Sequence, residues 1–227
     1  ALKLNYNYNA VAKSLRTNKT MTIGYLLPDI ANPFYSRIVR GIQDVAFEEG
    51  YNVIMCSNDN DIIKTERFVK MFLRHRVEGI IYSTPYNQVL NDMCENFKKQ
   101  GIPVINCYGS TRLCASDVVT GDAEKSCYQA TCHLLELGHQ KFACISGPLK
   151  IKICRERLSG FLDTLGKKDL KIRKEFIQEG DFKIEGGRKA MENLLAFPRD
   201  EYPTAIFIMN DLMAFGAIQK AKEKDLS

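Results

Sequence analysis

The hydrophobic pattern of the chain repeats one unit, in which a short apolar run precedes a longer segment with apolar residues at every third or fourth position. The first run, TIGYLL at 22–27, ends at Pro28. Short runs of this kind are typical of buried strands, and the longer spacing is typical of amphipathic helices. In the segment 34–49 one helical face, which we expect to face the core, carries four apolar residues: Phe34, Ile38, Ile42 and Val45.

The same pattern places the remaining elements along the chain. It predicts strands at 22–27, 52–56, 79–82, 104–107, 118–119, 142–145, 175–178 and 204–208. It predicts helices at 34–49, 63–74, 89–99, 122–137, 154–165, 185–196 and 211–223. Strands that alternate with helices favour parallel sheets covered on both faces. We therefore expect an α/β fold of two lobes, spanning 21–139 and 140–227, behind an arm at 1–20.

Charge changes the view of the arm. The net charge of +5 is unevenly distributed along the chain. Residues 1–20 contain no acid and four cations: Lys3, Lys13, Arg16 and Lys19. The other 207 residues therefore carry a net charge of only +1. A basic arm on a nearly neutral body is a candidate for binding a polyanion. A solvated, disordered terminus is the alternative. No apolar run has the length of a membrane span, and the chain does not begin with the apolar core of a signal peptide.

The eight cysteines include no C-x-x-C pair, and several lie inside apolar runs. This usage favours buried free thiols in a reducing cytosol. Cys127, Cys132 and His133 lie close together in sequence, but their spacing matches no standard zinc pattern. We expect neither a metal site nor a cofactor.

Candidate chemistry gathers where the predicted strands end. The strand-end loops carry aromatic rings, hydroxyls, amides and a few carboxylates: Phe34, Tyr35, Asn58, Ser83, Thr84, Asp122, Phe182, Asn210 and Asp211. The segment after Gly147-Pro148 adds Arg157. Such a mixture suits a small polar ligand with flat or CH-rich faces, such as a sugar or a nucleobase. Structural roles remain open, with Phe34 in the core, Asp122 and Asp211 as helix caps, and Arg157 paired with Glu156 or a neighbouring carboxylate.

The sequence does not favour an enzyme. No histidine lies in a strand-end loop, so a nucleophile there has no obvious base. Neither a G-x-G-x-x-G motif after the first strand nor a Walker loop is present.

Several motifs in order resemble the lactose/galactose-repressor (LacI/GalR) family of bacterial transcription regulators. The arm segment NAVAKSLR at 9–16 is similar to the family's hinge helix, and the run TIGYLLPDIANPFY at 22–35 resembles its first strand and loop. Further matches follow in the family's order: Leu137-Gly138-His139, Gly147-Pro148, Arg157 to Phe161, Gly180-Asp181-Phe182 and Asn210 to Ala214.

The resemblance implies a cytoplasmic, homodimeric repressor whose periplasmic-binding-protein-like lobes hold a small effector between them. It implies Arg157 as the main polar anchor, Phe182 as a stacking face, Asp211 as an acceptor, and Phe34 and Tyr35 as part of the first-lobe wall. The effector would be a sugar, a sugar phosphate or a purine.

The resemblance also gives the arm a role on operator DNA. It implies that Leu15 is a wedge for the minor groove, with Ala12 and Arg16 beside it, and apolar wedges flanked by cations do part base steps in this way. A helix of eight to ten residues is marginal in water, so we expect the free arm to be unfolded and to become helical on DNA.

Two departures qualify the resemblance. The family's helix-turn-helix domain would precede Leu4, and its last strands, with a return crossing to the first lobe, would follow Ser227. The sequence therefore predicts a chain truncated at both ends. A solute-binding protein of a sugar transporter with the same fold is the alternative function, and the basic arm and unpaired cysteines argue against it.

Overall fold

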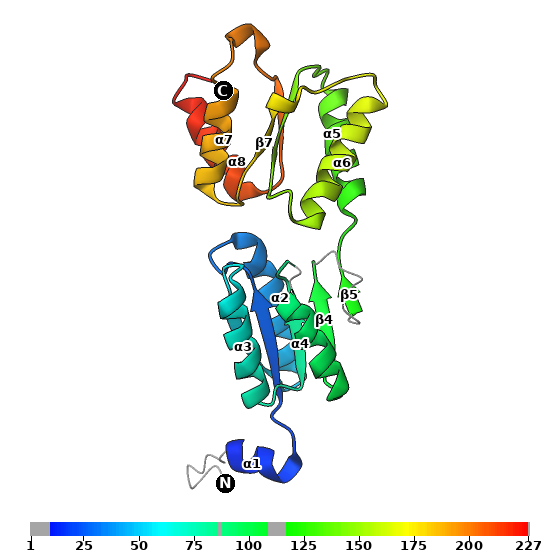
Figure 1. Cartoon of the computed structure of the whole chain (residues 1–227), viewed down its shortest axis with the longest axis vertical. Coiled ribbons are helices and arrows are strands. Elements are labelled where there is room, and N and C mark those ends of the chain that lie inside the picture. Colours follow the sequence, from blue (N-terminus) through cyan, green and yellow to red (C-terminus); the bar gives the residue numbers. More distant parts are fainter. Residues whose placement is uncertain (1–9, 86–87, 109–116, 227) are drawn as a thin grey trace. The chain divides into compact units, whose positions relative to one another are not determined.

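The computed structural model describes residues 10–85, 88–108 and 117–226, and the chain divides into two compact units, Ala1–Thr120 and Gly121–Ser227 (Figure 1). Each unit contains a parallel sheet with helices packed on it, so the predicted α/β fold class is confirmed. No helix in the described part of the chain combines the length and the apolar character needed to traverse a bilayer.

The first unit holds a five-stranded parallel sheet with the strand order β2-β1-β3-β4-β5. Its strands are β1 (Thr22–Leu27), β2 (Asn52–Ser57), β3 (Gly79–Tyr82), β4 (Val104–Cys107) and β5 (Asp117–Val119). Its helices are α1 (Ala10–Thr17), α2 (Pro33–Glu48), α3 (Ile62–Arg74) and α4 (Gln88–Lys99). The predicted elements agree with these bounds to within one or two residues.

One face of this sheet forms a closed core with α3 and α4. Ile80 and Tyr82 of β3 pack there with Phe72 of α3 and Phe97 of α4, and each is at most 1% exposed. Gly24 of β1 allows the close approach of this ring, since a Cβ atom there would lie 3.0 Å from the Phe72 ring and the ring would have to shift by a few tenths of an ångström. Side chains alternate along a strand, so Ile81 points to the opposite face, where α2 lies.

The α2 face is far less covered than the sequence predicted. Ala46 is the buried residue of this helix, whereas Phe34 is 41% exposed and Val45 is 61% exposed. The prediction that Phe34 and Val45 face the core was therefore wrong. Several apolar side chains of the helix, among them Ile38, Ile42 and Val45, border an open hollow.

The second unit holds a three-stranded parallel sheet with the order β7-β6-β8. Its elements are α5 (Ala123–Glu136), β6 (Phe142–Ser146), α6 (Lys152–Gly166), η2 (Lys174–Phe176), β7 (Ile177–Glu179), α7 (Ile184–Leu194), η3 (Arg199–Glu201), β8 (Ala205–Ile208) and α8 (Asp211–Lys222). The sequence placed β7 two residues early, because the turn η2 occupies the start of that apolar run.

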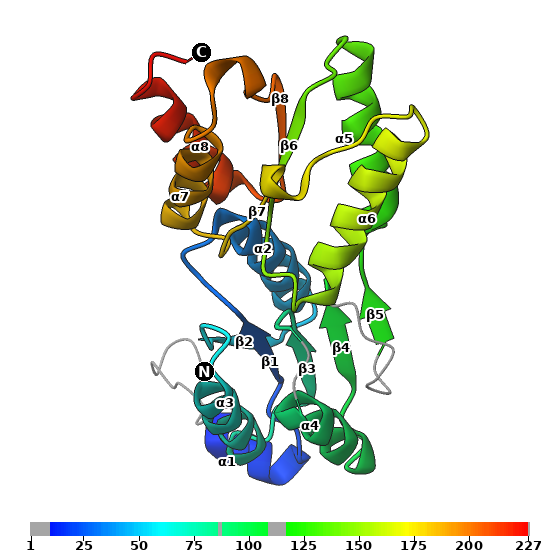
Figure 2. The same ribbon diagram turned by 45° about the horizontal axis from the view of Figure 1, so that its top comes forward.

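Two helix pairs cover the second sheet, with α5 and α6 on one face and α7 and α8 on the other (Figures 1 and 2). The α7–α8 contact is close enough to need glycine, since a Cβ atom on Gly216 would lie 1.9 Å from the carbonyl oxygen of Ile184. The lobe boundary at residues 139–140 stays a prediction. The packing of α5 on α6 favours a boundary before α5.

The arm differs from its expected state. We expected an unfolded arm in the absence of DNA, but residues Ala10–Thr17 form the helix α1. Local contacts favour this ending of the helix, because the Thr17 hydroxyl both accepts from the Lys19 amide at 3.3 Å and donates to the Lys19 carbonyl at 3.4 Å. The two turns of α1 therefore lead into a bonded linker.

Candidate functional site

The carboxyl ends of the strands in the first unit bring aromatic side chains together at one edge of the sheet. Phe34, in the first turn of α2, makes edge-to-face contacts with Tyr35 and with Tyr108, at centroid distances of 5.1 and 4.9 Å. Asn32 fixes the start of α2, because its side chain accepts from the Phe34 amide at 3.0 Å. These partly exposed rings can cover the apolar face of a small ligand.

Tyr108 is a member of this cluster that the sequence did not indicate. It follows β4 in a left-handed conformation (φ 66°). Its contact is with a residue 74 positions earlier, so no local pattern reveals it. The position of Tyr108 directly after a predicted strand was the available signal.

Hydroxyl groups lie at the end of β3. The Ser83 hydroxyl is 3.0 Å from the phenol oxygen of Tyr25, and both side chains are buried. Burial raises the pKa of Tyr25 to about 12, although the hydrogen bond with Ser83 opposes the shift. Thr84 is 2% exposed, and its hydroxyl has no hydrogen-bond partner among the described residues. An unsatisfied buried hydroxyl is costly, which makes Thr84 a candidate ligand donor.

Asn58, which the sequence also placed at a strand end, has a structural role. Its side chain donates to the Thr65 hydroxyl at 2.7 Å and accepts from the Asn60 amide at 3.1 Å. It is fully buried. These bonds hold the loop before α3.

In the second unit, Arg157 and Asn210 support the loops at the carboxyl edge of the sheet. Arg157 of α6 donates from Nη1 to the carbonyl of Met209 at 3.0 Å, and no ion pair with Glu156 forms, since Glu156 pairs with Lys152. Asn210 caps α8 by accepting from the Met213 amide at 3.0 Å. The helix cap is therefore Asn210, whereas the sequence alternative had proposed Asp211. Asp211 is the first residue of α8 and is exposed.

Phe182 is fixed from two sides. Its carbonyl accepts from the Asn210 side-chain amide at 3.0 Å, and its backbone is left-handed (φ 67°). Its ring lies on Gly147, where a Cβ atom would be only 2.3 Å from the ring carbon Cζ. The predicted stacking residue thus lies at the same strand-end edge as Asn210, in a defined orientation.

Asp122 occupies a different surrounding. It caps α5 by accepting from the Lys125 amide at 2.9 Å. It also borders a polar hollow of about 370 Å³ between α5 and α6, with Tyr128, Asp163 and Lys167. The cap explains this residue without a ligand, so its assignment to the ligand site stays a prediction.

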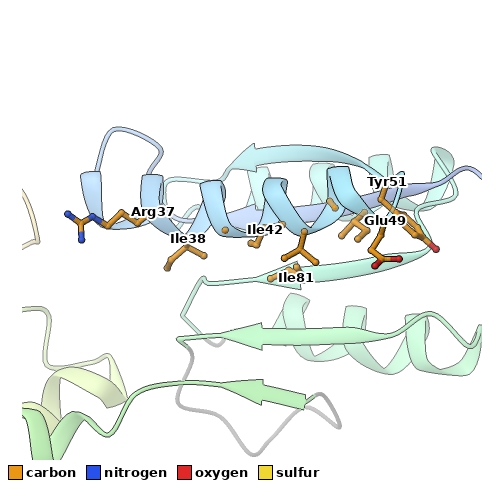
Figure 3. Close-up of a pocket in the computed structure, with 10 residues that line it drawn as sticks. Arg37, Ile38, Ile42, Glu49, Tyr51 and Ile81 are labelled. Atoms are coloured by element: carbon orange, nitrogen blue, oxygen red, sulfur yellow. The ribbon is translucent and has the colours of Figure 1, made fainter.

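The larger of the two described hollows, about 500 Å³, lies on the α2 face of the first sheet. Figure 3 shows Ile38 and Ile42 pointing from α2 toward the strand that carries Ile81, with Arg37 at one end and Glu49 with Tyr51 at the other. Its lining is mostly aliphatic, and it includes none of the predicted ligand residues. Its polar side chains lie at the two ends, and the middle is aliphatic, whereas a sugar site needs polar groups that converge on one ligand.

The arm presents one of its three predicted DNA contacts as an exposed apolar side chain. Leu15 of α1 is 74% exposed, and Arg16, also exposed, follows it. Ala12 lies within α1, but its side chain is outside the described residues. A large exposed leucine beside an arginine is suited to a contact outside the chain.

The described residues hold no group of three or more potential metal ligands. Their cysteines are free thiols: Cys56, Cys94, Cys107, Cys127, Cys132, Cys144 and Cys154. Burial raises the pKa of Cys107, and a hydrogen bond with Ser83 opposes the shift. The thiol is thus held in its neutral form, which is the unreactive one.

Comparison with known proteins identifies the family. The profile described as periplasmic binding proteins and sugar binding domain of LacI family matches residues 20–227. The "HTH-type transcriptional repressor PurR" of Aliivibrio fischeri (strain MJ11) is 33% identical over 225 residues, which is 99% of this chain and 66% of that protein. "Catabolite control protein A" of Priestia megaterium is 34% identical over 226 residues, 99% of this chain and 67% of that protein.

Solved structures agree with these relatives. A LacI family transcriptional regulator from Enterococcus faecium, with bound ribose, has a TM-score of 0.77 and 32% identity, and the match covers 91% of this chain and 73% of that one. CcpA of Lactococcus lactis has a TM-score of 0.79 and 27% identity, over 91% of this chain and 74% of that one. The chain spans about two thirds of the length of the curated relatives. It belongs to the LacI family, within the part that resembles periplasmic binding proteins.

Proposed function

We propose that this chain is the effector-binding part, with the hinge, of a ligand-responsive transcriptional repressor. The observation that carries the proposal is the helix α1, which is basic, exposes Leu15 and directly precedes a domain of the LacI family. A protein that only carries a solute to a transporter has no use for such an arm, whereas a DNA-binding regulator does. The full-length protein is then a cytoplasmic homodimer that binds operator DNA, and it has no catalytic activity.

The proposed effector is a sugar, a sugar phosphate or a purine. The Phe34 and Phe182 rings supply flat apolar surfaces, and Thr84 and Arg157 supply hydrogen-bond donors. Within the second unit, Arg157 donates to the Met209 carbonyl, and the Asn210 side chain donates to the Phe182 carbonyl. These bonds bring the hydrogen-bond donors of Arg157 and Asn210 to the segments that hold the Phe182 ring. The relative with bound ribose supports the sugar class.

Two single substitutions in the full-length protein separate the two parts of the proposal. Leu15→Ala should lower operator affinity, measured by fluorescence anisotropy without added effector, by about tenfold or more, because the apolar wedge is lost. It should leave thermal shifts unchanged with ribose, fructose 1-phosphate and purine bases.

Arg157→Ala should have the reciprocal effect. It should abolish the thermal shift that the wild-type protein shows with one of these compounds, and it should preserve effector-free operator binding. Arg155→Ala, an exposed arginine on the same helix, is the matched control. An unchanged operator affinity for Leu15→Ala excludes the wedge, and a preserved shift for Arg157→Ala places the ligand elsewhere.

A further inference from the structure

One carboxylate in the first unit holds the linker that joins the arm to the body. Glu78 directly precedes β3, and its Oε1 accepts from the backbone amides of Thr20 and Met21, at 2.5 and 2.8 Å. Its Oε2 accepts from the Tyr51 hydroxyl at 3.2 Å. The carboxylate therefore ties together the linker, the start of β2 and the start of β3, all at the amino-terminal edge of the sheet.

Further bonds hold the same linker. The Thr20 hydroxyl donates to the Arg76 carbonyl at 2.7 Å, and the Asn52 amide donates to the Met21 carbonyl at 2.8 Å. Met21 is left-handed (φ 49°), a conformation that non-glycine residues rarely adopt and that persists where the surroundings enforce it. The linker is thus held in one conformation by bonds to residues 31 to 58 positions away.

The charge of Glu78 suits this role. Burial raises the pKa of its carboxyl, but hydrogen bonds from Met21, Thr20 and Tyr51, with the nearby charge of Lys19, outweigh burial and lower it. The group is therefore a carboxylate at neutral pH. Hydrogen bonds to an ionised acceptor are about twice as strong as neutral ones.

β3 connects this carboxylate to the predicted effector edge. Glu78 directly precedes the strand and Ser83 directly follows it, so five residue steps, about 16 Å at 3.3 Å per residue, separate the two. The strand lies between β1 and β4, and Ile80 and Tyr82 are 1% exposed. Ser83 and Glu78 both donate backbone hydrogen bonds to β1, so the two ends belong to one packed element.

We propose that Glu78 is a positioning residue that sets the direction in which the arm leaves the body and transmits effector binding to it. This inference rests on the proposed function, because it assumes that the arm contacts operator DNA. It adds the physical connection between the effector edge and the arm.

Hydrogen exchange of the present chain tests the contact itself. Glu78→Gln preserves shape but removes the charge, and it should raise the exchange rates of the Thr20 and Met21 amides about tenfold. Tyr51→Phe removes one bond to the same carboxylate and should give a smaller increase. Glu95→Gln, an exposed glutamate on α4, should change neither amide. Unchanged rates in both test variants overturn the inference.

Operator binding by the full-length protein tests the transmission. One compound among ribose, fructose 1-phosphate and a purine base is chosen because it stabilises the wild type. We expect Glu78→Gln to diminish the effect of this compound on operator affinity, expressed as the fold-change between affinities with and without it, by about threefold or more. Its thermal shift with that compound should equal that of the wild type. A wild-type ratio in a folded Glu78→Gln protein overturns the inference alone. A wild-type protein that binds no operator overturns the proposed function, and the inference with it.

Discussion

Gly147 illustrates how a single residue controls the predicted ligand site. A Cβ atom at this position would lie 2.3 and 2.4 Å from two carbons of the Phe182 ring, and 2.9 Å from the Cys154 sulfur. Gly147→Ala must therefore displace the ring. We expect a loss of about 1–3 kcal/mol in the free energy of unfolding, as overpacked cores show, and a loss of the thermal shift produced by the effector.

Gly166→Ala provides the control for this prediction. Gly166 ends α6, and nothing lies within 4 Å of a Cβ atom placed on it. Alanine there should leave stability unchanged or raise it by up to about 1 kcal/mol, through the reduced entropy of the unfolded chain. Equal stabilities and equal thermal shifts for the two variants would contradict the proposed orientation of Phe182.

At the scale of elements, the start of α8 couples a helix cap to the Phe182 loop. The Asn210 side chain accepts from the Met213 amide and donates to the Phe182 carbonyl. Asn210→Ala should cost about 1–2 kcal/mol of stability, as lost caps do, and should also weaken effector binding. Asp61→Ala removes a cap of the same kind from α3, since the Asp61 side chain accepts from the Lys64 amide. It should cost similar stability but preserve effector binding, measured where both variants are folded. Urea unfolding and ligand titration of both variants decide the point.

The elements themselves were largely predictable, since each needs only a local pattern. Strand β6 (Phe142–Ser146) and helix α5, with its Asp122 cap, follow from an apolar run and a capping residue. The coverage of α2 was not predictable, because the periodicity of Phe34 and Val45 shows which face is apolar and not what covers it. In the same way, Asn210 rather than Asp211 caps α8, a choice between adjacent residues that backbone geometry decides.

The candidate site was predictable to the extent that it follows from the strand ends. Ser83, Phe182 and Asn210 lie where parallel strands end, as expected. Tyr108 and Glu78 were missed because their contacts join distant parts of the chain, and the partners of Glu78 are backbone amides that no side-chain pattern reveals. Sequence patterns thus locate an edge of a sheet, and the side chains that meet there depend on the fold.

At the scale of the whole molecule, buried cysteine thiols in both units make the free energy of unfolding depend on pH in the alkaline range. Burial raises the pKa of Cys56 in the first unit and of Cys154 in the second to about 11, from 9.0. Burial raises the pKa of Cys144 further. The unfolded chain releases these protons near pH 9, whereas the folded chain keeps them. Between about pH 9 and 11 the folded state therefore binds more protons, so the free energy of unfolding must fall as the pH rises.

A pair of substitutions in β6 isolates this effect. Each such thiol contributes a slope of ~1.4 kcal/mol per pH unit above its unfolded pKa. Cys144→Ala removes one titrating group, so the fall in unfolding free energy between pH 9 and 10, measured with urea, should shrink by about 1 kcal/mol, because the unfolded thiol is already half ionised at pH 9. Ile145→Val alters the next buried residue without a titrating group, and it should cost the same stability at both pH values. If Cys144→Ala shows the wild-type slope, the thiol ionises as readily in the folded chain as in the unfolded one, and burial does not hold its proton.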